Sequence, residues 1–93
     1  MILEVAILHI KSGLSLEFEK AFDHAKSIIQ AQKGFIDLQL KKCIEAEDKY
    51  ILLVNWETIE DHNIGFRTSL AYQDWKTLLH HFYDPFPVVE HYQ

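Results

Sequence analysis

The chain has 93 residues, the length of one small domain, and we expect a single domain over residues 1–93. Its net charge of −5 and its single arginine, Arg67, argue against nucleic-acid binding, which needs clustered basic side chains. Its apolar runs, such as Tyr50–Val54, are far shorter than the roughly 20 residues that span a bilayer, so we expect no membrane attachment. With one cysteine, Cys43, and no signal-peptide pattern, the sequence predicts a cytoplasmic protein. Its hydrophobic fraction of 48% exceeds what so small a core needs, which predicts a partner subunit or a ligand pocket.

The first predicted element is a strand over Ile2–Ile10, which is apolar on both sides of its alternation. A strand of this kind must be covered on both faces. Helices can cover one face of it in a protein this small, and something else must cover the other. The two faces carry Leu3, Val5 and Ile7, and Ala6, Leu8 and Ile10.

The first predicted helix follows a turn at residues 11–13. Apolar residues from Phe18 to Ile29 recur at spacings of three and four, with charged residues opposite. Ser12 or Ser15 is a suitable N-cap, and Gly34 is expected to end the helix.

Two strands come next, separated by a polar loop at residues 45–48. Phe35–Ile44 alternates apolar and polar residues, which is typical of a half-solvated strand, whereas Lys49–Trp56 is nearly all apolar and is predicted to be central.

A second helix is predicted in two pieces. Thr58 is a candidate N-cap for the first piece, Gly65 interrupts it, and Ser69 can cap the second. Residues 84–87 contain two prolines and are expected to be extended, and Val88–Tyr92 is predicted to be the last strand.

The resulting order of elements, βαββαβ, predicts an α+β protein with a ferredoxin-like fold. We expect one antiparallel sheet with both helices on one face, which leaves the other face free to form a homodimer.

His62 is the leading candidate for chemistry. It is expected in the first turn of the second helix, close to Trp56 and facing the space between helix and sheet. An imidazole, with an ordinary pKa of about 6.5, can accept or donate a proton near neutral pH. The alternative is a solvated histidine at a helix start. The neighbouring Glu60 and Asp61 suggest a metal site, but consecutive helical residues point apart, so no metal is predicted.

Polar and aromatic residues around the second helix and the third strand are the candidates for contacting a small molecule. The alternative for each is a purely structural role in the core, and His91 in the last strand is expected to be structural. A buried amide needs a partner, so Asn55 either bonds to the backbone or points into a cavity. The proposed substrate-binding residues are Asn55, Phe66, Tyr72, Trp75 and His80.

The chain as a whole resembles the antibiotic biosynthesis monooxygenase domain family, whose members are dimeric α+β barrel proteins. The resemblance lies in the order and spacing of several motifs along the chain. They are the Phe18/Phe22/Ala25/Ile28 helix, Gly34-Phe35, and Val54-x-Trp56-Glu57-x-x-x-Asp61-His62-x-x-x-Phe66-x-x-Ser69.

This resemblance implies a homodimer that pairs sheet against sheet. It also implies a pocket in which some members oxidise polyketide phenols or quinols without a cofactor and others degrade haem. Trp56 matches a tryptophan of the phenol oxygenases, but Leu52 and His62 stand where those enzymes have asparagine and tyrosine. Ala6 and Lys76 stand where the haem-degrading relatives have asparagine and the haem-binding histidine, which disfavours haem, and we expect no cofactor.

The sequence therefore predicts a cofactor-independent monooxygenase of a small aromatic or quinol-type substrate, with His62 and Trp56 as the catalytic residues. Two alternatives remain: a non-catalytic small-molecule-binding or regulatory dimer of the same fold, and a purely structural dimer.

Overall fold

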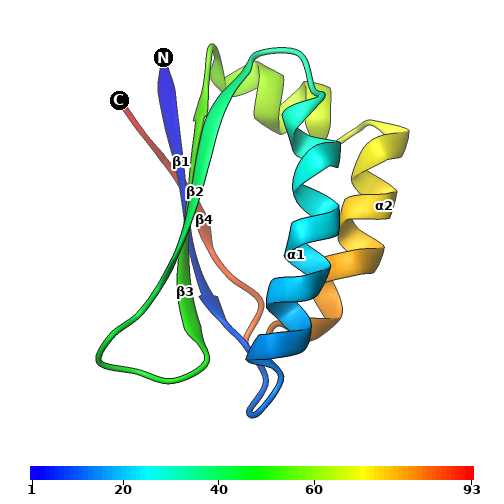
Figure 1. The fold of residues 1–93 in the computed structure, drawn as a ribbon. Coiled ribbons are helices and arrows are strands. Elements are labelled where there is room, and N and C mark those ends of the chain that lie inside the picture. The colour runs from blue at the N-terminus through cyan, green and yellow to red at the C-terminus, as the bar shows by residue number, and fades with distance from the viewer.

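The computed structural model, which describes residues 1–93, is a two-layer α+β structure (Figure 1). Its four-stranded sheet is antiparallel throughout, in the order β2-β3-β1-β4, and both helices cover the same face. The predicted ferredoxin-like fold is therefore confirmed. Neither helix is both long and apolar enough to cross a membrane. In chain order the elements are β1 (Ile2–His9), α1 (Ser15–Gln30), β2 (Phe35–Lys42), β3 (Lys49–Trp56), the π-helix η1 (Asp61–Phe66), α2 (Leu70–Leu79), the 3-10 helix η2 (His80–Phe82) and β4 (Val89–Tyr92).

The alternation of side chains along β1 and β3 separates an inner face, against the helices, from an open face. On β1, Ala6 and Leu8 are buried on the inner face, whereas Ile7 is 37% exposed on the open face. β3 follows the same rule, because Leu52 and Val54 are buried and their neighbour Leu53 is only half-buried. The two-sided apolar pattern of the sequence thus corresponds to one face that the helices cover and one face that this chain leaves uncovered.

The predicted apolar stripe of α1 packs on the inner face of the sheet. Phe18 is fully buried, with its ring centroid 5.1 Å from that of Tyr50 on β3 and 5.8 Å from that of Phe82 on η2. Burial of one such side chain contributes about 1.5–3 kcal/mol, so this cluster is a main source of stability. The rest of the core comes from α1, η1, α2 and the two central strands. It includes Ala6, Leu8, Phe22, Ala25, Ile29, Leu52, Val54, Trp56, Phe66, Trp75 and Leu79.

The start and end of α1 differ from the prediction. Neither Ser12 nor Ser15 caps it, because Leu14 occupies the N-cap position and the Ser15 hydroxyl donates to Asp48 Oδ1 in the β2–β3 loop, at 2.5 Å. A hydrogen bond that Ser15 donates to the ionised Asp48 carboxylate is stronger than one that its hydroxyl would accept from a helix N–H. The helix also ends at Gln30 rather than at Gly34, which instead adopts a positive φ of +81° in the turn into β2.

Both predicted caps of the second helical region are confirmed. The N–H of Asp61 donates to Thr58 Oγ1 at 3.2 Å, and the N–H of Tyr72 donates to Ser69 Oγ at 3.2 Å. Gly65, however, does not break the helix, since it lies within the π-helix, and the break falls at residues 67–69. π-helical turns are rare and occur often at functional sites.

Candidate active site

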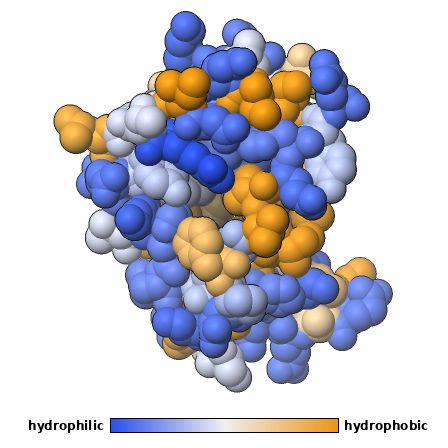
Figure 2. All heavy atoms as spheres, turned by 180° about the vertical axis from the view of Figure 1, so that it is seen from behind, coloured by the Kyte–Doolittle hydropathy of each residue, from blue (hydrophilic) through white to orange (hydrophobic).

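A small cavity lies between the inner face of the sheet and the second helical region. Its volume is about 50 Å³, enough for a few water molecules, and most of its lining is apolar. Figure 2 shows the molecule from the side of β4, with a hollow near the centre where apolar and hydrophilic side chains meet. The polar lining residues come from β1, η1, α2, η2 and the segments that follow η1 and η2: Glu4, His62, Arg67, Tyr72, His80 and Tyr83.

Glu4 is the one carboxylate in the lining, and it is only 5% exposed. β1 places it on the inner face because it shares the alternation of Ala6. Its Oε1 accepts a hydrogen bond from Trp56 Nε1, at 2.9 Å, and lies 3.3 Å from His62 Nε2. Burial raises the pKa of Glu4, while the Trp56 hydrogen bond and the charge of Arg67 act in the opposite direction. The site therefore holds a carboxyl group whose carboxylate is a stronger base than usual.

His62 joins this carboxyl group to the last strand. Its ring is 4% exposed and stacks on Trp56, with centroids 5.3 Å apart and an angle of 24° between the planes. Its Nδ1 lies 2.8 Å from Nε2 of His91 on β4. Burial, together with the charges of Arg67 and His91, lowers the pKa of His62 to about 3. The ring is thus uncharged at physiological pH, and its 3.3 Å contact with Glu4 is not an ion pair.

The outer part of the cavity is bordered by aromatic rings. His80 packs edge-on against Tyr72 and Phe86, with centroid distances of 5.8 and 4.9 Å. Burial lowers the pKa of His80 and raises the pKa values of Tyr72 and Tyr83, so all three are neutral near pH 7. They can donate or accept hydrogen bonds but carry no charge. Phe86 is 59% exposed, so its side chain is the least restrained part of the rim.

The structure brings together most of the residues that the sequence singled out. His62, Phe66, Tyr72, Trp75 and His80 line the cavity. Trp56 does not line it but lies directly behind it, fully buried, where it contacts both Glu4 and His62.

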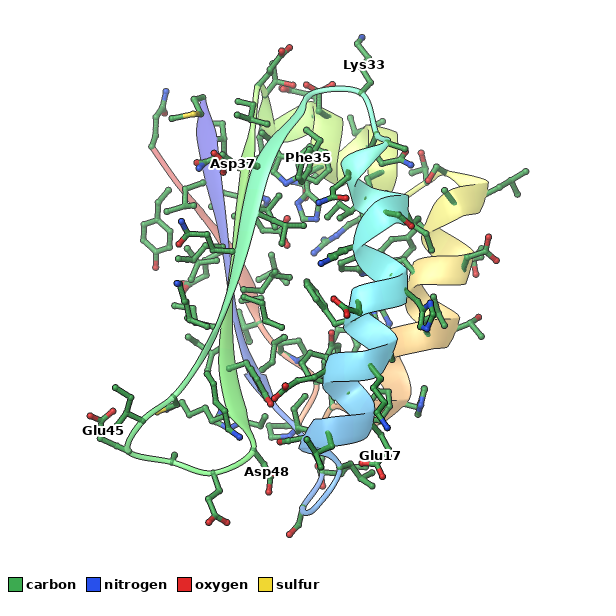
Figure 3. The ribbon with its side chains drawn as sticks, in the orientation of Figure 1. Glu17, Lys33, Phe35, Asp37, Glu45 and Asp48 are labelled. Carbon is green, nitrogen blue, oxygen red and sulfur yellow. The ribbon has the colours of Figure 1, made fainter.

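Asn55 does not join this group. Residues 54 and 56 of β3 point toward the helices, so Asn55 between them points to the open face. Its Nδ2 donates to Asp37 Oδ1 on β2, at 2.8 Å, and Figure 3 shows Asp37 directed away from the helices. The amide has its partner on the far side of the sheet from the cavity.

Sequence reasoning missed four polar residues of the site: Glu4, Arg67, Tyr83 and His91. One signal was available for Glu4, because a charged residue shares the β1 face that carries Ala6, Leu8 and Ile10. No local signal exists for His91, since only the pairing of β4 with β1, in which His91 lies opposite Glu4, brings it to His62.

The fold and the cavity define a class of protein: a ferredoxin-like α+β domain with a small, mostly apolar pocket that is lined by a buried carboxyl group and a buried imidazole. The chain belongs to the antibiotic biosynthesis monooxygenase family, whose sequence profile it matches over residues 1–78.

Two relatives match different shares of this chain. The uncharacterized protein YczJ of Bacillus subtilis is 59% identical over 93 residues, which cover 100% of this chain and 98% of YczJ. A mycobilin-producing heme oxygenase of Mycobacterium tuberculosis is 25% identical over 59 residues, covering 63% of this chain and 56% of the enzyme.

Solved structures of the family superpose closely. A family member from Bordetella bronchiseptica has a TM-score of 0.94 at 32% identity, covering 99% of this chain and 94% of its own. SnoaB, a cofactor-independent oxygenase from Streptomyces nogalater, has a TM-score of 0.76 at 18% identity, covering 98% and 87%. At that identity the likeness to SnoaB concerns the fold alone.

The residues of this site do not fit a haem. Glu4 would place a buried carboxyl group against the macrocycle. Lys76, which the resemblance matched to the haem-binding histidine, is exposed on α2, and His80 is held among Tyr72 and Phe86. No reaction step is therefore assigned to haem.

Proposed function

We propose that this protein is a cofactor-independent monooxygenase of a small aromatic or quinol-type substrate, with His62 and Trp56 at the centre of its active site. The observation that supports this most is the cluster of Glu4, His62 and Trp56 at the inner end of an apolar cavity. Substrate contacts are proposed for Phe66, Tyr72, Trp75 and His80, which line it.

The chemistry requires an electron-rich phenol that gives up its proton and then an electron to dioxygen. A dry, apolar pocket favours this step because it excludes water from the reactive anion and radical. One oxygen atom enters the ring as a carbonyl, the other leaves as water, and the substrate itself supplies the electrons, so no external reductant is needed. The protein must remove a proton and stabilise an anion. The guanidinium of Arg67 at the cavity wall, which forms no ion pair within the chain, suits the second task.

The cavity must become larger before it can hold the proposed substrate. An aromatic substrate needs more than about 50 Å³, and side-chain movement at the rim must supply the space. Phe86 is the residue best placed to move, because it is largely exposed and its ring packs at the rim against those of His80 and Tyr83.

Oxygen consumption with a panel of naphthols, dihydroxynaphthalenes and hydroquinones tests the proposal. We expect uptake by the wild type and a fall in kcat of about 100-fold or more in His62→Ala. The matched control is His81→Ala, which removes an exposed histidine of η2 outside the cavity and should leave the rate unchanged. Saturable binding without oxygen uptake from any compound would instead favour the non-catalytic binding dimer.

We further propose a homodimer that pairs the open faces of two sheets. That face is apolar in its centre, where Val5 and Leu53 lie opposite each other on the central strands, and Ile7 is 37% exposed. Leu53→Asp should give an 11 kDa monomer in sedimentation velocity. Leu70→Asp, at an 89% exposed position on the helical side, should leave the dimer intact. A wild-type chain that sediments as a monomer at micromolar concentration would refute the dimer.

A further inference from the structure

The three groups Glu4, His62 and His91 form a continuous chain of polar contacts from the cavity to the edge of the sheet. Glu4 and His62 line the cavity, whereas His91, on the edge strand β4, is half-buried and does not line it. The two links are 3.3 Å, from Glu4 Oε1 to His62 Nε2, and 2.8 Å, from His62 Nδ1 to His91 Nε2. The contact with His91 therefore leads away from the cavity and toward solvent.

One oxygen of the Glu4 carboxyl group has no hydrogen-bond partner in the protein. Trp56 and His62 both contact Oε1, whereas Oε2 makes no hydrogen bond within the protein. It is not sealed off either, since no fully buried polar side-chain atom lacks a partner. One oxygen is thus anchored by the protein, and the other is available to a molecule in the cavity.

We infer that Glu4, His62 and His91 are a proton relay, in which Glu4 exchanges a proton with the substrate and the two histidines carry it to and from solvent at the β4 edge. This inference rests on the proposed monooxygenase function, and it identifies the groups that would carry the proton of the substrate.

The proton moves in a balanced sequence. The substrate hydroxyl gives its proton to Glu4 Oε2. The protonated carboxyl group then turns so that this proton faces His62 Nε2, and the Trp56 hydrogen bond passes to the other oxygen. His62 Nε2 takes the proton while His62 Nδ1–H passes its own to His91 Nε2, and His91 releases its Nδ1 proton to water. When dioxygen is later reduced to water, the same path runs in reverse and restores both imidazole tautomers.

The environment of His62 requires that the two transfers be concerted. Because its pKa is lowered to about 3, the ring cannot hold an extra proton and must lose one as it gains another. A second partner at hydrogen-bond distance is needed for this, and His91 is that partner. The charged and titratable groups around the relay are Arg67, Tyr72 and Tyr83 near Glu4, and Arg67 near both histidines.

The relay is first tested by NMR of protein labelled with ¹⁵N in its histidine rings, which needs no substrate. We expect neutral His62 in one dominant tautomer between about pH 5 and 8. Glu4→Gln should change that tautomer and move the titration midpoint of His91 by about half a pH unit or more. The matched control Glu90→Gln removes an exposed carboxylate from the open side of β4 and should change neither. An unchanged tautomer and midpoint in Glu4→Gln would overturn the relay.

A second measurement tests the relay independently of Glu4→Gln. His91→Ala, near the chain end, should lower kcat about 100-fold with little change in KM, and added imidazole should restore part of the rate. A wild-type rate in His91→Ala would overturn the relay and leave the monooxygenase proposal standing. Absence of turnover in the wild type would overturn the monooxygenase instead, and the NMR result would then decide the relay by itself.

Discussion

The hydrogen bond between Trp56 and Glu4 should be the costliest single polar contact to remove from this protein. It joins two side chains that are 0% and 5% exposed, at 2.9 Å. A hydrogen bond to an ionised group contributes about 1.5–3 kcal/mol. Replacing an indole by a phenyl ring in a packed core adds about 1–2 kcal/mol for the lost volume. Trp56→Phe is therefore expected to lower the free energy of unfolding by about 2.5–5 kcal/mol, a large part of the 5–15 kcal/mol typical of a domain.

Trp75→Phe is the matched control, since it makes the same chemical change at a buried position. Trp75 is 6% exposed, and its indole N–H donates to no group in the protein, so only the packing loss of about 1–2 kcal/mol is expected. Urea unfolding of both variants followed by circular dichroism gives the two free energies.

The pH dependence separates the hydrogen bond from packing. The Trp56 bond lowers the pKa of Glu4 and so favours the ionised carboxylate. The difference between wild type and Trp56→Phe should therefore shrink as the pH falls and Glu4 becomes protonated, whereas the Trp75→Phe difference should stay constant. Equal, pH-independent losses in both variants would refute the reasoning.

Three further predictions concern Glu4, a turn and the rim of the cavity. The pKa of Glu4 is raised on folding, so the folded state binds more protons than the unfolded state between the two pKa values, and stability falls as pH rises through that interval. Glu4→Gln should hence be more stable than wild type above the interval and equal to it below the ordinary value of 4.5, as thermal melts across pH will show. Gly34→Ala should destabilise more than Gly13→Ala: both have φ near +80°, but only at Gly34 would a Cβ clash with a side chain, that of Asp61. Gly13→Ala should cost about 1–2 kcal/mol in urea unfolding, and an equal loss in both would contradict the clash. Phe86→Ala should change the free energy of unfolding by less than about 1 kcal/mol. It should also lower the ratio of the KM for bicyclic phenols to the KM for monocyclic phenols. A KM ratio equal to that of the wild type would show that the Phe86 ring does not limit the size of the cavity.

The sequence by itself determined the fold and the face of most side chains. Alternation along β1 and β3 and the three-to-four spacing in α1 depend only on how the backbone directs successive side chains. The same rule put Ala6 and Leu8 on one face of β1, and the structure shows that this face packs against the helices. Local hydrogen bonds could also be predicted, and the caps at Thr58 and Ser69 were correct because a cap and its helix are neighbours in the chain.

Only the tertiary structure decided how the site is assembled. The Ser15 hydroxyl bonds to Asp48, 33 residues away, so the predicted local cap was wrong. Glu4 and His91 come from opposite ends of the chain and meet His62 because β4 pairs with β1 in one particular register.

The chemistry of the site depends on that assembly as well. An isolated glutamate and histidine have ordinary pKa values, and it is burial beneath the second helical region that raises one and lowers the other. The sequence could therefore indicate His62 and Trp56 as candidates, but the carboxyl group that they contact and the path by which a proton would leave are properties of the folded sheet.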